Sequence, residues 1–225
     1  MATRAPAPSL RREAALWAEQ RVLIGVDEVG RGPLAGPVVA AAVLFPARAR
    51  RVRGVRDSKE LPAAKRRKLA ERIRDRARAI GIGAASTKEI DRLNIRRATA
   101  LAMRRAVYRT CRIAGILDGP ADPLPADVII LIDGLPMPEL GMPHEALVDG
   151  DALCYSVAAA GVVAKTVRDE LMCRLARRYP AYGWDSNMGY GTASHREAIA
   201  VSGATAHHRF SFEPVSQLSL NLSVM

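Results

Sequence analysis

The sequence predicts an α/β fold, and three observations support that prediction. Short apolar runs rich in β-branched residues alternate with longer stretches of helical composition, and glycine or proline bounds most of them. One run, residues 127–132 (DVIILI), is continuously apolar after its first residue, as expected of a central strand covered on both faces. The chain has 225 residues and is 49% hydrophobic, which is enough for one domain with a buried core.

The N-terminal half is expected to supply the first strands. In order, we expect a loose tail over residues 1–9, a short helix over 10–20, strands over 22–28 and 37–45, a strongly basic segment over 47–56 and a helix over 62–79. Leu16 and Trp17 are the side chains with which the short helix packs inward. Pro62 favours a helix start because a proline in the first turn needs no N–H. The basic segment suits a solvated loop and a phosphate-contacting arm equally well.

The C-terminal half is expected to be mostly helical. In order, we expect a strand over residues 80–85, a short helix over 87–90 capped by Thr87, a helix over 91–114, the apolar strand over 127–132, a short edge strand over 146–148, an unbroken helix over 151–178 and a helix over about 195–201. We divide the chain into a tail with its short helix (1–20), a compact domain whose part from about 179 is helical (21–214) and a tail (215–225).

The most informative stretch is residues 24–39, which read IGVDEVGRGPLAGPVV. Two acids, Asp27 and Glu28, stand at the end of the first expected strand, where carboxylates are costly unless a cation holds them. The stretch has four glycines, three of them in the loop that follows the acids, and around Arg31 the backbone of this loop can approach a ligand closely. A polar hairpin turn is the ordinary explanation for an Asp-Glu pair before a glycine loop. The length of this pattern favours a functional explanation instead.

Composition narrows the classes of partner. The formal net charge of +11 suits nucleic acid, although ribosomal and membrane-surface proteins also carry such charge. Aromatic residues make up only 4% of the chain, which argues against the stacking platforms of single-strand binders. Cys111, Cys154 and Cys173 form no C-x-x-C pair, so we expect reduced thiols in a cytoplasmic protein. The chain starts without a signal-peptide pattern, and no apolar run is long enough to span a membrane.

The pattern GxDExGRGPLAGPVVAAAV around the two acids resembles the signature of type 2 ribonuclease H, the ribonuclease HII family. The resemblance extends over about residues 22–214 in the family's order. It implies a ribonuclease H-like fold, in which a five-stranded mixed sheet is flanked by helices and followed by a helical C-terminal extension. It also implies an endoribonuclease that cleaves the RNA strand of RNA/DNA hybrids and incises 5′ to single ribonucleotides in duplex DNA, leaving 5′-phosphate and 3′-hydroxyl ends.

The resemblance implies that four acids are catalytic metal ligands: Asp27, Glu28, Asp133 and Asp151. Asp133 ends the apolar strand, which is where α/β folds place ligand and metal sites. Asp151 lies in the sequence Val-Asp-Gly-Asp, and Asp149 stands where the family commonly has a lysine. Which of these two aspartates faces the metal therefore stays open.

The resemblance also implies the substrate-binding residues: Gly30, Arg31 and Gly32 at the ribose-to-deoxyribose junction, Ser58 and Lys59 at the substrate backbone, and Tyr190 on the following sugar. Met188 replaces the lysine that the family has in the Tyr190 loop. His195, His207 and His208 have no ligand spacing and are expected in packing or phosphate contacts.

Residues 156–169 resemble the family's long helix, with Gly161 in place of the usual serine. In an unbroken helix Asp169 would lie roughly 27 Å from Asp151, which excludes Asp169 from the metal cluster. We assign Asp169 to structure, paired with an arginine. Lys165 would lie about 21 Å from Asp151 by the same rise, and its role stays open between a duplex contact and a structural one.

Four carboxylates in one site repel one another unless cations compensate them. Oxygen ligands without a Cys/His cluster select Mg²⁺ or Mn²⁺, and we expect two such ions per site. Adjacent strand residues point to opposite faces, so Asp27 and Glu28 cannot both reach one cluster from a regular strand. We therefore expect the strand to break at Glu28, or Glu28 to bind through its backbone carbonyl.

Two other functions stay open at this stage. A non-catalytic nucleic-acid binder would explain the charge but not the placement of the acids. A related nuclease of the ribonuclease HIII type would have an additional N-terminal substrate-binding domain, for which the tail before Leu10 leaves no room. The expected substrates are RNA/DNA hybrids and ribonucleotide-containing duplex DNA, and the expected state is a monomer without a membrane partner. The segment QLSLNL, from Gln217 to Leu222, resembles short motifs that bind bacterial sliding clamps, although an ordinary amphipathic tail also fits.

Overall fold

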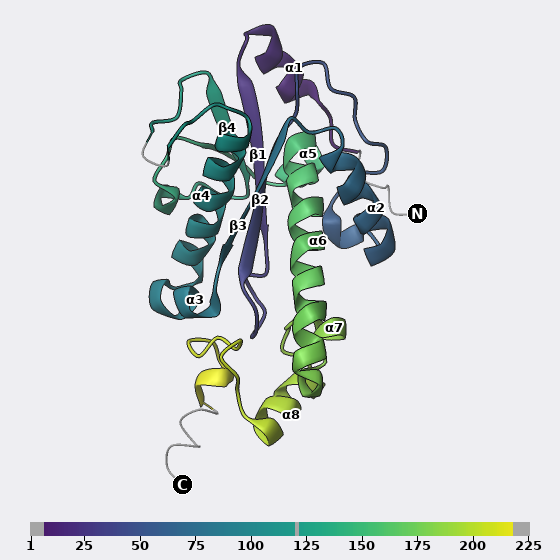
Figure 1. Cartoon of the computed structure of the whole chain (residues 1–225), viewed down its shortest axis with the longest axis vertical. Coiled ribbons are helices and arrows are strands. Elements are labelled where there is room, and N and C mark those ends of the chain that lie inside the picture. Colours follow the sequence, from purple (N-terminus) through teal and green to yellow (C-terminus); the bar gives the residue numbers. More distant parts are fainter. Residues whose placement is uncertain (1–6, 120–121, 218–225) are drawn as a thin grey trace.

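The structure is a computed structural model that describes residues 7–119 and 122–217, and it contains a five-stranded sheet (Figure 1). The strands are β1 (Val22–Val29), β2 (Val38–Leu44), β3 (Ala79–Ala85), β4 (Val128–Asp133) and β5 (Glu145–Leu147). Their order across the sheet is β3-β2-β1-β4-β5. The β1–β2 and β2–β3 pairs are antiparallel and the β1–β4 and β4–β5 pairs are parallel, so the predicted mixed sheet is confirmed.

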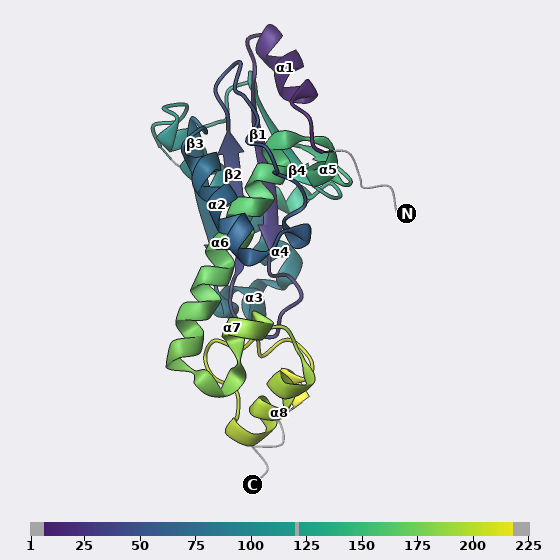
Figure 2. The same ribbon diagram turned by 90° about the vertical axis from the view of Figure 1, so that its right-hand side faces the viewer.

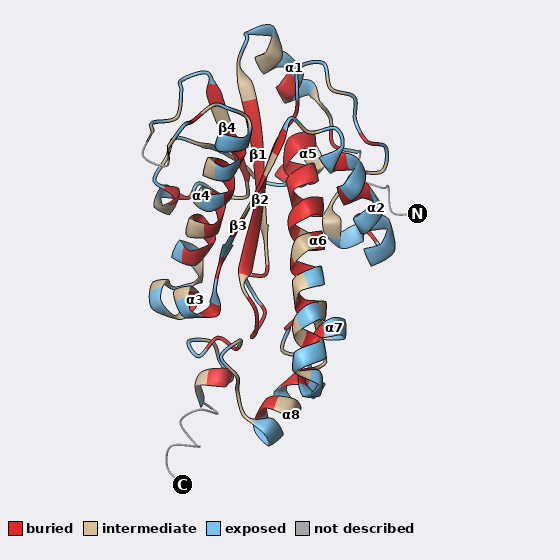
Figure 3. Ribbon diagram, viewed as in Figure 1, coloured by how far each residue is buried: buried red, intermediate tan, exposed pale blue. Residues whose placement is uncertain are grey.

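Two long helices cover the two faces of the sheet. α4 (Ile95–Ile113) lies on one face and α6 (Tyr155–Arg178) on the other, and both turn buried sides toward the strands (Figures 1 and 3). Alternate strand residues face opposite sides. Ile24 and Val26 thus belong to the core under α4, whereas Ala41 and Val43 belong to the core under α6. The sheet is buried on both faces, as the apolar run in β4 predicted.

Glycine lets α6 approach β1 closely just before the acidic pair. A Cβ atom at Gly25 would overlap the main chain of Ser156 and Val157. Only a residue without a side chain allows this approach. The start of α6 is therefore held directly over the end of β1, where Asp27 lies.

Beyond the sheet the chain forms a small helical part, seen at the lower end of Figure 2. It consists of the second half of α6, a 3-10 turn (Pro180–Tyr182), α7 (Trp184–Asn187) and α8 (Ala193–Ser202). Trp184 and Ile199 are fully buried there and pack with Met172 of α6 in a separate apolar cluster. The predicted helical C-terminal part is confirmed.

Three helix ends differ from the prediction. α2 (Ala63–Arg74) ends before the predicted residue 79, because the chain returns to the sheet and β3 already begins at Ala79. α3 (Thr87–Leu93) is capped by Ser86 rather than Thr87: the Ser86 hydroxyl accepts the Glu89 N–H, and the Glu89 carboxylate accepts the Ser86 N–H. α4 begins at Ile95 rather than residue 91, because Asn94 has a positive φ of 69° that no helix continues through.

The predicted unbroken helix over residues 151–178 is wrong. A short helix, α5 (Gly150–Leu153), carries Asp151, and α6 starts afresh at Tyr155. Cys154 between them is extended, with φ −117° and ψ 127°, and it forms a parallel bridge with Ser9. The spacing computed along one straight helix therefore does not apply to Asp151.

The N-terminal helix α1 (Arg11–Ala18) follows the predicted position, with Leu16 and Trp17 packed against the core. Short 3-10 helices cover Ser58–Glu60 and Pro138–Leu140. Within the two described ranges, none of the helices combines the length and the apolar character that a membrane crossing requires.

Candidate active site

Asp27 and Asp133 lie side by side on the neighbouring strands β1 and β4. β1 and β4 are parallel neighbours with Val26 opposite Ile132, so the next residue on each strand is an aspartate. Asp27 faces α6, because its carboxylate occupies the space that a Cβ atom at Gly161 would need. Two strand ends thus carry acids under one helix, as the sequence predicted for this edge.

Asp151 reaches the same region through α5. The N–H of Gly150 donates to Asp133 Oδ1 at 2.7 Å, which ties the start of α5 to the end of β4. Asp149, by contrast, is exposed and has a positive φ of 56°. Of the two aspartates left open by the sequence, Asp151 is the one whose charge interacts with the other acids.

Glu28 does not lie at a break in the strand. β1 continues to Val29, and Glu28 stays in register opposite Ala40, so the predicted break is wrong. The antiparallel pairing with β2 holds the backbone extended through this residue. Glu28 therefore points to the opposite side from Asp27, where its carboxylate accepts a hydrogen bond from Arg31 at 3.4 Å.

The acids raise one another's pKa. Burial holds the pKa of Asp27 well above its usual range, and repulsion from Glu28 and Asp133 adds to that effect. Burial likewise raises the pKa of Glu28, although Arg31 partly offsets the shift. The pKa of Asp151 is raised to about 6 by burial and then by the carboxylates of Asp57 and Asp133. The cluster therefore holds more negative charge than its surroundings neutralise.

Lys59 and Asp57 belong to this electrostatic cluster. Burial alone would lower the pKa of Lys59, but the carboxylates of Asp57, Asp27 and Asp151 outweigh it and raise that pKa. The Asp57 carboxylate also accepts the N–H of Lys59 at 2.9 Å, which fixes the turn that carries Lys59. Asp57 was not predicted as a site residue. Its only sequence signal was its place at the head of the Asp-Ser-Lys motif.

Among the described residues, no three Asp, Glu, His or Cys side chains converge closely enough, as they stand, to hold a metal ion. One oxygen of each strand-end aspartate accepts a backbone N–H: Asp27 Oδ1 accepts that of Glu28 and Asp133 Oδ1 that of Gly150, both at 2.7 Å. The donor chemistry still fits a hard divalent cation. Carboxylates from three separate elements offer the oxygen donors that such ions prefer, and Lys59 and Arg31 oppose part of their charge.

The glycine loop is held by two fully buried arginines. Arg209 donates to the carbonyl oxygens of Gly30, Arg31 and Gly36 at 2.5–3.0 Å. Arg168 of α6 donates to the carbonyl oxygens of Ala35, Pro37 and Met188 at 2.9–3.1 Å. Burial lowers the pKa of Arg209 to about 9. Because the carbonyls turn inward to these guanidinium groups, the loop has one fixed path.

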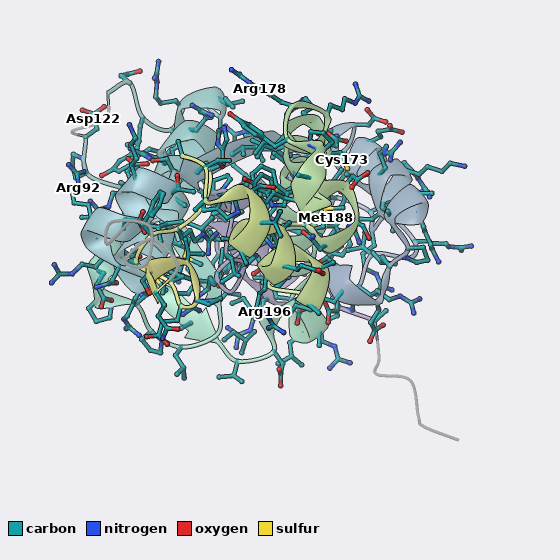
Figure 4. The ribbon with its side chains drawn as sticks, turned by 90° about the horizontal axis from the view of Figure 1, so that it is seen from below. Arg92, Asp122, Cys173, Arg178, Met188 and Arg196 are labelled. Atoms are coloured by element: carbon teal, nitrogen blue, oxygen red, sulfur yellow. The ribbon has the colours of Figure 1, made fainter. Side chains whose placement is uncertain are left out.

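The other predicted substrate residues lie beside this loop. The Tyr190 side chain is 47% exposed, and its ring is the nearest group to the space beside Gly32. Seen from below, Met188 marks the loop that leads to Tyr190, next to α8 with Arg196 (Figure 4). His195 Nδ1 lies 2.9 Å from the Tyr190 carbonyl oxygen, so this histidine packs against the loop, as predicted.

Ser58 and Lys59 form a 3-10 turn that a buried ion network supports. Arg66 donates to the Ser58 and Leu61 carbonyl oxygens and to Asp169 Oδ2, the last at 2.5 Å. Lys165 donates to the other Asp169 oxygen at 2.6 Å. The predicted pairing of Asp169 with an arginine is confirmed. For Lys165 the structural role applies, because its charge is bound to Asp169.

Comparison with known proteins bears on what this site does. The sequence matches the family model described as Ribonuclease HII over residues 24–215. The ribonuclease HII of Synechococcus sp. (strain JA-3-3Ab) is 49% identical over 214 residues, which cover 94% of this chain and 90% of that protein. The ribonuclease HII of Paracoccus denitrificans (strain Pd 1222) is 47% identical over 207 residues, which cover 92% and 91%. This chain belongs to the ribonuclease HII family.

As a ribonuclease HII, the chain is an endoribonuclease of the hydrolase class, and the family expected from its motifs is confirmed. Solved structures show that it has the ribonuclease H-like fold. Ribonuclease H2 from Pyrococcus horikoshii OT3 matches with a TM-score of 0.69 and 22% identity over 90% of this chain and 99% of that chain. Bst ribonuclease HIII in complex with Mn²⁺ matches with a TM-score of 0.68 and 22% identity, over 94% of this chain and 74% of that chain. Ribonuclease HII from Archaeoglobus fulgidus, in a complex with PCNA, matches with a TM-score of 0.66 and 23% identity, over 85% of this chain and 95% of that chain.

Proposed function

We propose that this ribonuclease HII cleaves the RNA strand of RNA/DNA hybrids and incises 5′ to single ribonucleotides embedded in duplex DNA. The observation that carries the proposal is the mutual charge repulsion of Asp27, Asp133 and Asp151, which three separate elements bring to one region. This region lies beside the glycine loop, against which the Tyr190 ring packs at Gly32. A non-catalytic binder would have no use for mutually repelling acids at this place. The products would carry 5′-phosphate and 3′-hydroxyl ends.

The acids are proposed as ligands for two divalent ions, Mg²⁺ or Mn²⁺. Asp27, Asp133 and Asp151 face the region under α6, and Glu28 would contribute from the other side of β1, through its backbone carbonyl or its carboxylate. Two bound ions would supply an activated water and stabilise the leaving oxygen. The Mn²⁺ complex of Bst ribonuclease HIII, which has the same fold, supports this choice of metal.

Substrate recognition is assigned to the surface beside the acids. Gly30, Arg31 and Gly32 would approach the 2′-hydroxyl that separates RNA from DNA, and Tyr190 would contact the following sugar. Ser58 and Lys59 would approach the backbone phosphates. Exposure supports these roles, because the Arg31 side chain is 50% exposed and stands next to the acidic cluster.

A comparison of four duplexes tests the proposal: an RNA/DNA hybrid, duplex DNA with one ribonucleotide, all-DNA and all-RNA. With Mn²⁺ or Mg²⁺ we expect cleavage of the first two only, and a chelator should abolish it. Binding without cleavage would support the non-catalytic alternative. Cleavage of the hybrid without incision at the single ribonucleotide would contradict the junction-reading role of Gly30–Gly32 and Tyr190.

A sliding clamp is proposed as a protein partner through residues 217–222, of which the structure describes only Gln217. The complex of Archaeoglobus fulgidus ribonuclease HII with PCNA supports the idea that such an enzyme binds a clamp. Deletion of residues 217–225 should abolish capture of the protein by an immobilised bacterial clamp. Unchanged capture would remove this proposal and leave the proposed enzymatic activity intact.

We place the protein in the cytoplasm as a monomer. The proposed substrates arise where the genome is replicated. Cys111, Cys154 and Cys173 are free thiols, which suits a reducing compartment. Light scattering should give the mass of a single chain, 24.3 kDa. A larger mass would contradict the monomeric state.

A further inference from the structure

Glu13 of α1 is a buried acid that is not among the predicted site residues. Its exposed fraction is only 1%. Oε1 accepts the N–H of Ser156 at 2.8 Å and the hydroxyl of Ser156 at 2.7 Å, and the thiol of Cys154 lies 3.3 Å away. The second oxygen, Oε2, is buried without a hydrogen-bond partner. A carboxylate in this environment is costly, so its contacts with the chain from Cys154 to Ser156 need an explanation.

These contacts cap the start of α6 from another helix. The first N–H groups of an α-helix have no partner within the helix, and Cys154 at the cap position supplies no side-chain acceptor. Glu13 accepts the N–H of Ser156, and the Ser9 carbonyl accepts the N–H of Tyr155 at 3.1 Å. A negative charge at a helix N-terminus is also favourable to the helix dipole. The N-terminal segment therefore anchors the start of α6.

The anchored point joins α5, which carries Asp151, to α6, which packs against Asp27. On one side, the Cys154 N–H donates to the Gly150 carbonyl at 2.8 Å, and the Gly150 N–H donates to Asp133. Asp151 follows Gly150 directly. On the other side, α6 carries Gly161, over which the Asp27 carboxylate lies. Glu13 is thus joined to Asp133 and Asp151 through Cys154 and Gly150, and to Asp27 only through the packing of α6 on β1.

We infer that Glu13 is a positioning residue for the acidic cluster: it holds the break at Cys154 and so sets where Asp151 and Asp133 stand relative to Asp27. This inference rests on the proposed function, because it takes these aspartates to be metal ligands. A neutral amide could accept the same two hydrogen bonds with a smaller burial cost. The charged acceptor makes stronger bonds, which suits an anchor that resists displacement when a cation enters the cluster.

The test measures Mn²⁺ affinity by calorimetry, without substrate, for Glu13→Ala, Glu13→Gln and Glu19→Ala. Residues that orient metal ligands typically change metal affinity 10–100-fold, so we expect Glu13→Ala to bind Mn²⁺ about 10-fold more weakly. Glu13→Gln should recover most of the affinity, because the amide oxygen still accepts from Ser156. Glu19→Ala is the matched control: this acid directly follows the same helix, and its exposed side chain pairs with Arg21 at the surface.

Cleavage kinetics separate positioning from general weakening of the fold. For Glu13→Ala we expect a low kcat at limiting Mn²⁺ that returns toward the wild-type value with excess Mn²⁺, and an unchanged KM. KM should not move because Arg168 and Arg209, not α1, hold the glycine loop. A rise in KM that excess Mn²⁺ does not reverse would overturn the inference.

The outcomes also distinguish this inference from the proposed function. A wild-type protein that neither binds Mn²⁺ nor cleaves would refute the proposed function. A wild-type protein that does both, with Glu13→Ala binding Mn²⁺ equally well, would refute only the role of Glu13. If circular dichroism shows that Glu13→Ala is unfolded, Ser156→Ala decides instead. This variant removes only the hydroxyl contact; weaker Mn²⁺ binding supports the inference, and unchanged binding overturns it.

Discussion

Asp27 combines the end of a buried strand with a carboxylate whose charge Lys59 offsets only in part. Burial and the neighbouring acids raise its pKa well above the usual range, so this side chain depends most on a cation to become charged. Asp27→Asn keeps the shape and removes the charge. We expect cleavage of the hybrid to fall by at least about 1,000-fold, the scale of losses when a catalytic unit is broken. Binding of the hybrid, measured by fluorescence anisotropy, should persist.

Asp149→Asn is the matched control for that substitution, because Asp149 is exposed and directly precedes α5. Its cleavage rate should stay close to that of the wild type. The metal-free melting temperature of Asp27→Asn should rise at neutral pH, since a buried acid with a raised pKa costs stability whether it is held protonated or charged. Retained cleavage in Asp27→Asn would refute the assignment of this residue.

His208 makes a second prediction at the residue scale, on the pH dependence of stability. Burial, together with the nearby His195 and His207, lowers the pKa of His208 to about 4 from its ordinary 6.5. The unfolded chain therefore binds a proton below pH 6.5, whereas the folded chain does not until about pH 4. The folded protein therefore loses roughly 1–3 kcal/mol of unfolding free energy as the pH falls from 6.5 to about 4.

The measurement compares urea unfolding of the wild type and His208→Asn at pH 7.5 and at pH 4.5. The acids of the site titrate in the opposite direction, so only the difference between the two proteins isolates this histidine. We expect His208→Asn to be less stable at pH 7.5, because it loses the contact with His195 at 3.2 Å. The gap should narrow at pH 4.5. A gap that stays constant would contradict the prediction.

At the scale of elements, the glycine loop depends on residues that no local pattern reveals. Arg209 follows the loop by more than 170 residues, yet it donates to the carbonyls of Gly30, Arg31 and Gly36. Lysine has fewer donors and no planar fork, so Arg209→Lys loses two or more of these bonds. We expect the free energy of unfolding to fall by about 2–4 kcal/mol, because buried carbonyl oxygens of the loop lose their charged hydrogen-bond donor.

The functional consequence of Arg209→Lys should be confined to the substrate. KM for the hybrid should rise because the loop loses its fixed path, while Mn²⁺ affinity should stay the same because the acids do not contact Arg209. Arg196→Lys is the control, since Arg196 is exposed on α8 and makes a single bond, to the Gly191 carbonyl at 3.0 Å. Equal effects of the two substitutions would show that the loop does not depend on Arg209.

The strands could be predicted from the sequence better than the breaks between helices. The strands were predictable because apolar β-branched runs between glycines and prolines leave few alternatives, and Asp27 and Asp133 follow from two such runs. The break at Asn94 had a local signal that we did not use, because asparagine favours helix N-caps and tolerates a positive φ. The break at Cys154 was not predictable, because cysteine carries no such signal. Cys154 is extended on account of its contacts with Ser9 and Glu13, which lie more than 140 residues earlier.

The cluster itself was predictable only in part. Asp57 and Glu13 owe their places to tertiary contacts, and neither has a periodicity or spacing that marks it. The orientation of Glu28 is the opposite case: simple strand alternation predicted that it points away from Asp27, and the structure keeps that alternation where we expected a break. The motif thus named the right segment, whereas the path of the backbone through it depended on the pairing with β2.

At the scale of the whole molecule, the net charge of +11 predicts binding to duplexes that weakens with salt. Each phosphate contact made by a lysine or arginine contributes about 0.9 to the slope of log K against log salt concentration. Lys59 stands at the acidic cluster, on the α6 side of the sheet, so it is expected to contact a phosphate near the cut. Lys59→Ala should therefore reduce the slope by about 0.9, measured by anisotropy on an uncleaved hybrid in Ca²⁺.

Arg112→Ala tests whether the charge acts through one face. Arg112 is exposed near the end of α4, which covers the opposite side of the sheet from α6. If the duplex lies on the side of the glycine loop, this variant should bind with the wild-type slope although it loses the same charge. An equal loss of slope in both variants would mean that the hybrid is held by diffuse charge over the whole surface. The placement of Lys59 beside the acids would then have no bearing on how the substrate is held.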